Sequence, residues 1–74
     1  NAGEASAAIL QLSQAFNKGK LDGDEFRSVM ELMPLAMDAI ADELNVVKGE
    51  LLVLAPQGKI TAKVMRDAFM NSAE

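Results

Sequence analysis

The sequence predicts an all-α fold, a small orthogonal bundle of about five short helices with a repeated helix-start motif. Three observations predict it. Apolar residues recur at helical spacing along most of the chain, and no stretch alternates apolar and polar residues as a half-buried strand would. Prolines and glycines then divide the chain into segments of short-helix length, as at Gly19, Pro34 and Pro56.

The first predicted helix covers residues 4–16. Its apolar residues recur three or four positions apart and would form one buried stripe: Ala5, Ala8, Ile9, Leu12 and Phe16. Gly19 follows closely and suits the left-handed conformation that often ends a helix. We therefore expect a turn at residues 17–19.

Pro34 separates the second and third predicted helices, which cover residues 23–33 and 34–44. Proline disrupts a helix interior but fits the first turn of a new helix. The second helix would bury Phe26, Val29, Met30 and Met33. The third would bury Leu35, Ala36, Ala39, Ile40 and Leu44.

A fourth helix at residues 48–55 and a fifth at residues 62–72 complete the prediction. The fourth contains an apolar run, residues 51–54, and lacks a good N-cap, so we expect it to be the least stable element. A short helix that is apolar on all sides must be covered on several of them. Either it lies at the centre of this domain or it docks on sequence outside it, and both readings stay open.

One helix-start pattern occurs twice, with an offset of 39 residues, as from Asp22 to Thr61. Asp22 and Thr61 stand where an N-cap would accept bonds from unpaired backbone N–H groups. Glu25 lies three residues after Asp22 and would complete a capping box. Apolar pairs flank both caps as hydrophobic staples: Leu21 with Phe26, and Ile60 with Met65.

Composition limits the function classes. The 74 residues fit a single helical domain, residues 1–74, and a chain that opens on Asn1 is expected to be excised from a much longer protein. There is no Cys and no His, which excludes disulfides and the usual zinc sites. No apolar run is long enough to span a membrane. A net charge of −4 with dispersed basic residues argues against a nucleic-acid partner.

No catalytic, cofactor or metal site is predicted. Residues 19–26 resemble the second half of a calcium loop, but the earlier ligand positions hold Gln14, Phe16 and Lys18, so calcium binding is rejected. The acidic cluster at Asp38, Asp42 and Glu43 is interpreted as a solvated helix face. An exposed apolar contact surface is predicted instead, with these candidate residues: Met37, Leu51, Leu52 and Leu54.

Two stretches of the chain are similar to a segment of phage tail tape measure proteins. The first comprises residues 10–16 (LQLSQAF), 18–21 (KGKL) and 24–27 (DEFR). The second comprises residues 34–36 (PLA), 40–41 (IA), 49–51 (GEL) and 58–61 (GKIT), with Leu44, Val46, Leu54, Val64 and Ala68 in register. Each motif alone is a common cap-and-stripe pattern. Their shared order and spacing over most of the chain make the resemblance specific.

The resemblance implies a structural, non-enzymatic role as a protein-interaction module in tail assembly and length determination. It implies as partners the rest of the tape measure chain and the tail tube or tail assembly chaperone proteins. It implies a location in the virion tail, and in the host cytoplasm during assembly. The helices are too short and too interrupted to be the extended ruler itself. The alternative is a free-standing peptide-binding module, a calcium-free EF-hand-like scaffold that takes an amphipathic helix in a Met-lined groove.

Overall fold

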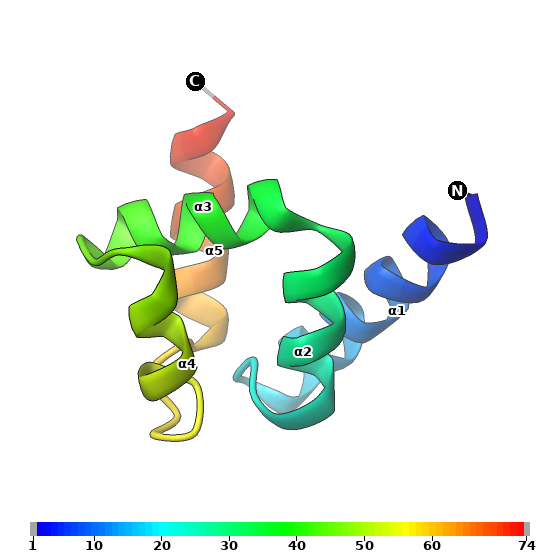
Figure 1. The fold of residues 1–74 in the computed structure, drawn as a ribbon, viewed down its shortest axis with the longest axis horizontal. Coiled ribbons are helices and arrows are strands. Elements are labelled where there is room, and N and C mark those ends of the chain that lie inside the picture. Colours follow the sequence, from blue (N-terminus) through cyan, green and yellow to red (C-terminus); the bar gives the residue numbers. More distant parts are fainter. Residues whose placement is uncertain (1, 74) are drawn as a thin grey trace.

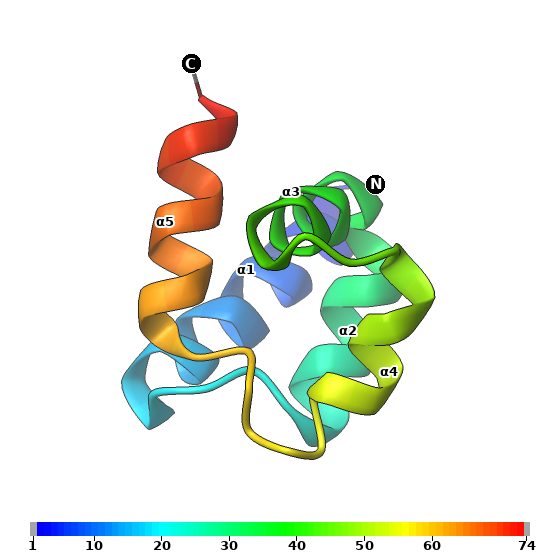
Figure 2. The same ribbon diagram turned by 90° about the vertical axis from the view of Figure 1, so that its left-hand side faces the viewer.

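Five α-helices and one short 3₁₀ helix form residues 2–73, the part of the chain that the computed structural model describes (Figure 1). In chain order they are α1 (Ala2–Lys18), α2 (Gly23–Leu32), α3 (Pro34–Leu44), η1 (Lys48–Glu50), α4 (Leu51–Leu54) and α5 (Ala62–Ser72). Helix α3 crosses α5, since it is seen nearly end-on where α5 stands upright (Figure 2). The predicted small all-α bundle is confirmed.

The two copies of the helix-start pattern lie side by side. The loop between α1 and α2 and the loop before α5 run next to each other (cyan and yellow in Figure 2) and form an isolated antiparallel bridge between Lys20 and Thr61. Each copy begins with a glycine at positive φ, 97° at Gly19 and 73° at Gly58. A side chain would strain the backbone at this φ, so glycine is the residue that these turns require.

Two backbone hydrogen bonds join the loops. The Leu21 N–H donates to the Ile60 carbonyl at 2.8 Å, and the Ala62 N–H donates to the Gly19 carbonyl at 2.9 Å. The side chains of Leu21 and Ile60 are both fully buried. The repeat therefore fastens the start of α2 to the start of α5 through backbone pairing over an apolar base.

A single apolar core fills the space between the helices. Its buried members come from every α-helix and from both paired loops: Ala15, Leu21, Phe26, Val29, Met37, Ile40, Ala41, Leu51, Ala55, Ile60, Met65 and Ala68. No described side-chain polar atom is buried without a hydrogen-bond partner. Burial of apolar surface is therefore the main source of stability in this part of the chain.

The break at Pro34 is confirmed. Helix α2 ends at Leu32, one residue earlier than predicted, and Met33 links the two helices with φ −135° and ψ 67°. The Met33 N–H still donates to the Val29 carbonyl at 2.8 Å, which completes the last turn of α2. Pro34 then occupies the first turn of α3, where its missing N–H has no partner to lose.

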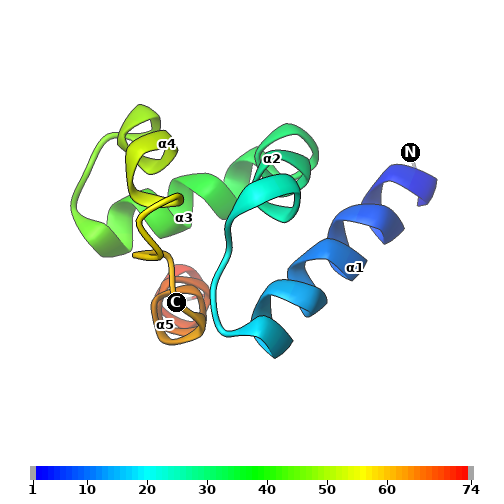
Figure 3. The ribbon, with the colours of Figure 1, turned by 90° about the horizontal axis from the view of Figure 1, so that it is seen from below.

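Helix α1 lies at the edge of the bundle, with α2 as its main neighbour (Figure 3). Among residues 3–18 of this helix, only Ala8 and Ala15 are buried, and Leu12 between them is half-buried. The prediction was wrong for the rest of the stripe, which is exposed: Ala5, Ile9 and Phe16. A helix packed mainly against one neighbour buries a narrow strip, and here that strip carries small residues that allow close approach.

The buried face of α3 is rotated from the predicted one. Met37, Ile40 and Ala41 are buried, whereas Leu35 is 80% exposed. The other residues of the predicted face are half-buried: Ala36, Ala39 and Leu44. Apolar residues surround most of α3, so helical spacing alone could not select the face that meets the core.

The predicted fourth helix is two short elements, the 3₁₀ helix η1 and the four-residue α4. Val47 precedes them and makes no side-chain cap bond. Leu51 and Ala55 point into the core, whereas Leu52 and Val53 are exposed. The apolar run therefore supplies a core residue and an outward patch at once.

The rotation of α3 leads to a stability prediction. We expect Met37→Ala to lower the free energy of unfolding by about 2–4 kcal/mol, because it empties a fully buried site. Leu35→Ala on the same helix is the matched control and should stay within about 0.5 kcal/mol of the unmodified chain. Urea denaturation of both variants measures the difference. Equal losses would contradict the observed face.

Candidate functional site

Asp22, the first predicted N-cap, takes part in an ion cluster and makes no cap hydrogen bond. Asp22 stands at the N-cap position of α2 in extended backbone, but its side chain makes no cap hydrogen bond. The Lys18 Nζ donates to Asp22 Oδ1 at 2.5 Å and to Glu25 Oε1 at 2.7 Å. The predicted capping box between Asp22 and Glu25 does not form, because the lysine at the end of α1 engages both carboxylates.

This cluster moves the pKa values of its members. The hydrogen bond from Lys18 lowers the pKa of Asp22 below its ordinary value, and desolvation opposes this. The same hydrogen bond, with one from its own backbone N–H, lowers the pKa of Glu25. The two carboxylates in turn raise the pKa of Lys18. The three charges are close to solvent, so salt screens their attraction.

Lys18 also occupies a position that a calcium-binding loop would need for a ligand. In the calcium-loop alignment Lys18 falls at a ligand position, and its ammonium sits against the two carboxylates that such a loop would offer. Among residues 2–73, no group of three or more acidic, cysteine or histidine side chains is arranged to hold a metal ion. The positive charge beside these two carboxylates is the ammonium group of Lys18.

Thr61, the second predicted cap, makes the bond that Asp22 does not. Its Oγ1 accepts a hydrogen bond from the Val64 N–H at 3.2 Å, from an extended N-cap conformation. The two copies of the repeat thus start their helices by different means, an ion cluster for α2 and a hydroxyl cap for α5.

The predicted contact surface is only partly at the surface. Met37 and Leu51 are fully buried core residues, so their assignment to that surface was wrong. Leu54 is half-buried against the core, and Leu52 is 57% exposed. Buried side chains at Met37 and Leu51 cannot contact a partner helix, so neither residue contributes to a binding surface.

A groove that the sequence did not reveal lies on another face, between α1, α3 and α5. Its apolar half is an open pocket of about 330 Å³. Seven of its lining residues are apolar, and they come from the three helices, from the α2–α3 junction and from the residue after α5: Leu12, Met33, Leu35, Ala36, Ala39, Phe69 and Ala73. The ring of Phe69 also meets the half-exposed Phe16 of α1 edge to face, with centroids 6.4 Å apart. Residues that were predicted to be buried pack against the core and also line this groove: Leu12, Met33, Ala36 and Ala39.

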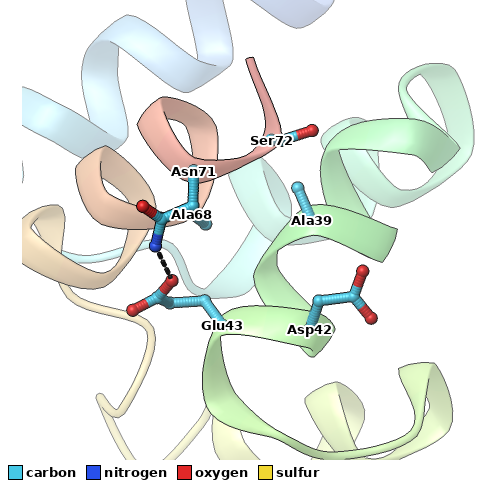
Figure 4. A pocket seen from close by; sticks show the side chains of 6 residues that line it. All are labelled: Ala39, Asp42, Glu43, Ala68, Asn71 and Ser72. Carbon is cyan, nitrogen blue, oxygen red and sulfur yellow. Dashed lines mark hydrogen bonds between the residues drawn. The ribbon is translucent and has the colours of Figure 1, made fainter. Parts of the chain in front are cut away.

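The groove continues into an acidic half of about 270 Å³, because Ala39 and Ser72 line both pockets. Figure 4 shows Glu43 on α3 reaching toward Asn71 near the end of α5, with Asp42 on the neighbouring part of α3. Glu43 Oε1 accepts a hydrogen bond from Asn71 Nδ2 at 2.7 Å. The resulting surface is apolar at one end and negative at the other.

A stability prediction separates the two helix starts. We expect Thr61→Ala to lower the free energy of unfolding by about 1 kcal/mol, because the Val64 N–H loses its acceptor. Thr61→Ser keeps the hydroxyl and should recover most of the loss. Thermal or urea unfolding measures both, and equal effects of Ala and Ser would exclude the cap bond as the cause.

The ion cluster predicts a pH dependence. The pKa values of Asp22 and Glu25 are lowered in the folded state, so their contribution is complete above the ordinary carboxyl values of about 4. It is lost as the pH falls through the lower, folded-state values. Lys18→Met should therefore flatten the acid limb of the stability curve below about pH 5. Lys59→Met is the control, since Lys59 has no ion pair within residues 2–73; an identical flattening there would contradict the assignment.

Comparison with known proteins gives one match. A family model described as "Tape measure protein" matches residues 1–74. No curated protein and no solved structure matches the chain. Within the described residues, no helix combines the length and apolar character needed to cross a bilayer. The family consists of structural proteins of phage tails, and the resemblance seen in the sequence is confirmed. The chain belongs to the tape measure protein family.

Proposed function

We propose that this chain is a protein-interaction module of a phage tail tape measure protein, acting in tail assembly and length determination. It is one folded domain of a much longer chain. Its partners are other parts of that chain, together with tail tube or tail assembly chaperone proteins. It acts in the host cytoplasm during assembly and resides in the virion tail, and it performs no catalysis.

The observation that carries the proposal is the shape of the fold. Residues 2–73 occupy 31 × 28 × 22 Å. The same number of residues in one continuous helix would span about 110 Å, at 1.5 Å per residue. Folded compactly, these residues would add at most about 30 Å to the length of a ruler, far less than the same residues in one helix. The exposed apolar groove of the domain gives it a different use, which is contact with other tail components.

The charge distribution agrees with a protein partner. The chain carries a net charge of −4, and six of its seven basic residues are in ion pairs with its own carboxylates. Phosphate-rich or anionic surfaces need a free cluster of positive charge. These residues offer none, so neither nucleic acid nor a membrane is proposed as a partner.

An in-frame deletion in a phage that carries this segment tests the proposal. We expect tails that fail to assemble, or tails shortened by no more than about 30 Å, since the folded module contributes at most its own length. The control deletes the same number of residues from a helical region of the same protein, which should shorten tails by about 110 Å.

Electron microscopy of negatively stained tails measures both. Shortening by about 110 Å on deletion of this module would show that it is extended in the tail. Unchanged assembly, length and infectivity would show that its contacts are not needed. Either result would overturn the proposal.

A further inference from the structure

The groove between α1, α3 and α5 is a surface with two chemically different ends. Leu12, Met33 and Phe69 line the apolar end, and Asp42 and Glu43 lie at the other. Ala39 lies in the stretch that both ends share. A partner that fills the whole groove must therefore match apolar surface and negative charge in one molecule.

The walls of the groove determine the shape of that partner. The groove is bounded by helices, and the only pairing of extended backbone in residues 2–73 is the bridge between the two loops. A peptide strand therefore finds no sheet edge to extend on this face. Ala36 and Ala39 lie in the groove, and such small residues let a helix axis approach to about 8 Å.

The charges in the groove determine which sign of charge the partner must carry. Asp42 makes no side-chain hydrogen bond or ion pair among residues 2–73. Glu43 is held only by the neutral amide of Asn71. Both lie in the last turn of α3, at the negative end of the helix dipole. Two carboxylates at a helix C-terminus without a cation of their own are complementary to lysine or arginine on a partner.

We propose that this groove binds an amphipathic helix of a partner protein that carries lysine or arginine at one end of its apolar face. The inference rests on the proposed function and names the kind of partner. The apolar side chains of the helix enter between Leu12 and Phe69, and its basic residues reach Asp42 and Glu43. A second copy of this chain fits poorly, because its net charge is negative and its basic residues are largely paired.

The test uses this chain and two designed peptides of about 18 residues, long enough to form a helix. Both carry leucines at i, i+3, i+4 and i+7. One has two lysines at the end of the leucine face, and the other has two glutamates there. We expect the lysine peptide to bind at least about tenfold more tightly. Its binding should shift the backbone amide resonances of Ala36, Ala39 and Ser72.

Two exposed leucines supply matched variants. Leu35 lines the groove and is 80% exposed, so Leu35→Asp should leave the fold intact, as circular dichroism can verify, while weakening binding about tenfold or more. Leu52→Asp makes the same change on the α4 surface and should leave binding unchanged. The double variant Asp42→Asn with Glu43→Gln should bring the two peptides to within about threefold of each other.

Three results would overturn the inference. The two peptides could bind equally well, which would remove the role of the carboxylates. The shifts could fall around Leu52, with Leu52→Asp abolishing binding, which would place the helix on α4. Sedimentation could show a dimer that Leu35→Asp dissociates, which would make a second copy the occupant. None of these affects the tail-length experiment, so failure here and failure of the proposed function are distinguishable.

Discussion

The pairing of two loops is the constraint on which this fold depends. The loops before α2 and before α5 are distant in sequence, yet two short backbone hydrogen bonds join them over the buried side chains of Leu21 and Ile60. Helices as short as these have little stability on their own and need tertiary packing. The pairing provides it by fixing where two of them begin. The remaining helices then enclose a core that draws on every α-helix.

The same constraint accounts for the groove. Because α2 and α5 are joined at their starts, their far ends are free to diverge around α3, and α1 follows α2 at the edge of the bundle (Figure 3). Helix α1 therefore leaves Ile9 and Leu10 exposed, and Phe16 is covered only in part, by Phe69 of α5. The groove is thus a consequence of the loop pairing that positions the helices around the core. A domain of this size leaves a large share of its surface exposed in any case.

Much of the fold could be predicted from the sequence, since local residues mark it. Pro34 marks a helix boundary through its missing N–H, and Thr61 marks a helix start through its hydroxyl. The buried face of α3 could not be predicted, because Leu35 and Met37 are equally apolar and only the neighbouring helices decide between them. Asp22 has the right residue type for a cap, but a lysine four positions earlier competes for its carboxylate. The groove was missed for the same reason as the face, since it is built from three helices whose relative placement no local pattern encodes.

Amide hydrogen exchange at the loop pairing tests the account most directly. The Leu21 and Ala62 N–H groups donate across the two loops, whereas the Glu50 N–H donates within the capless η1 turn. If the pairing holds the fold together, the first two amides exchange only when the whole domain unfolds, with a free energy equal to that from urea denaturation. The Glu50 amide should exchange faster, through local opening. Exchange of Leu21 and Ala62 at the rate of Glu50 would show that the loops separate while the helices stay packed, and would contradict the account.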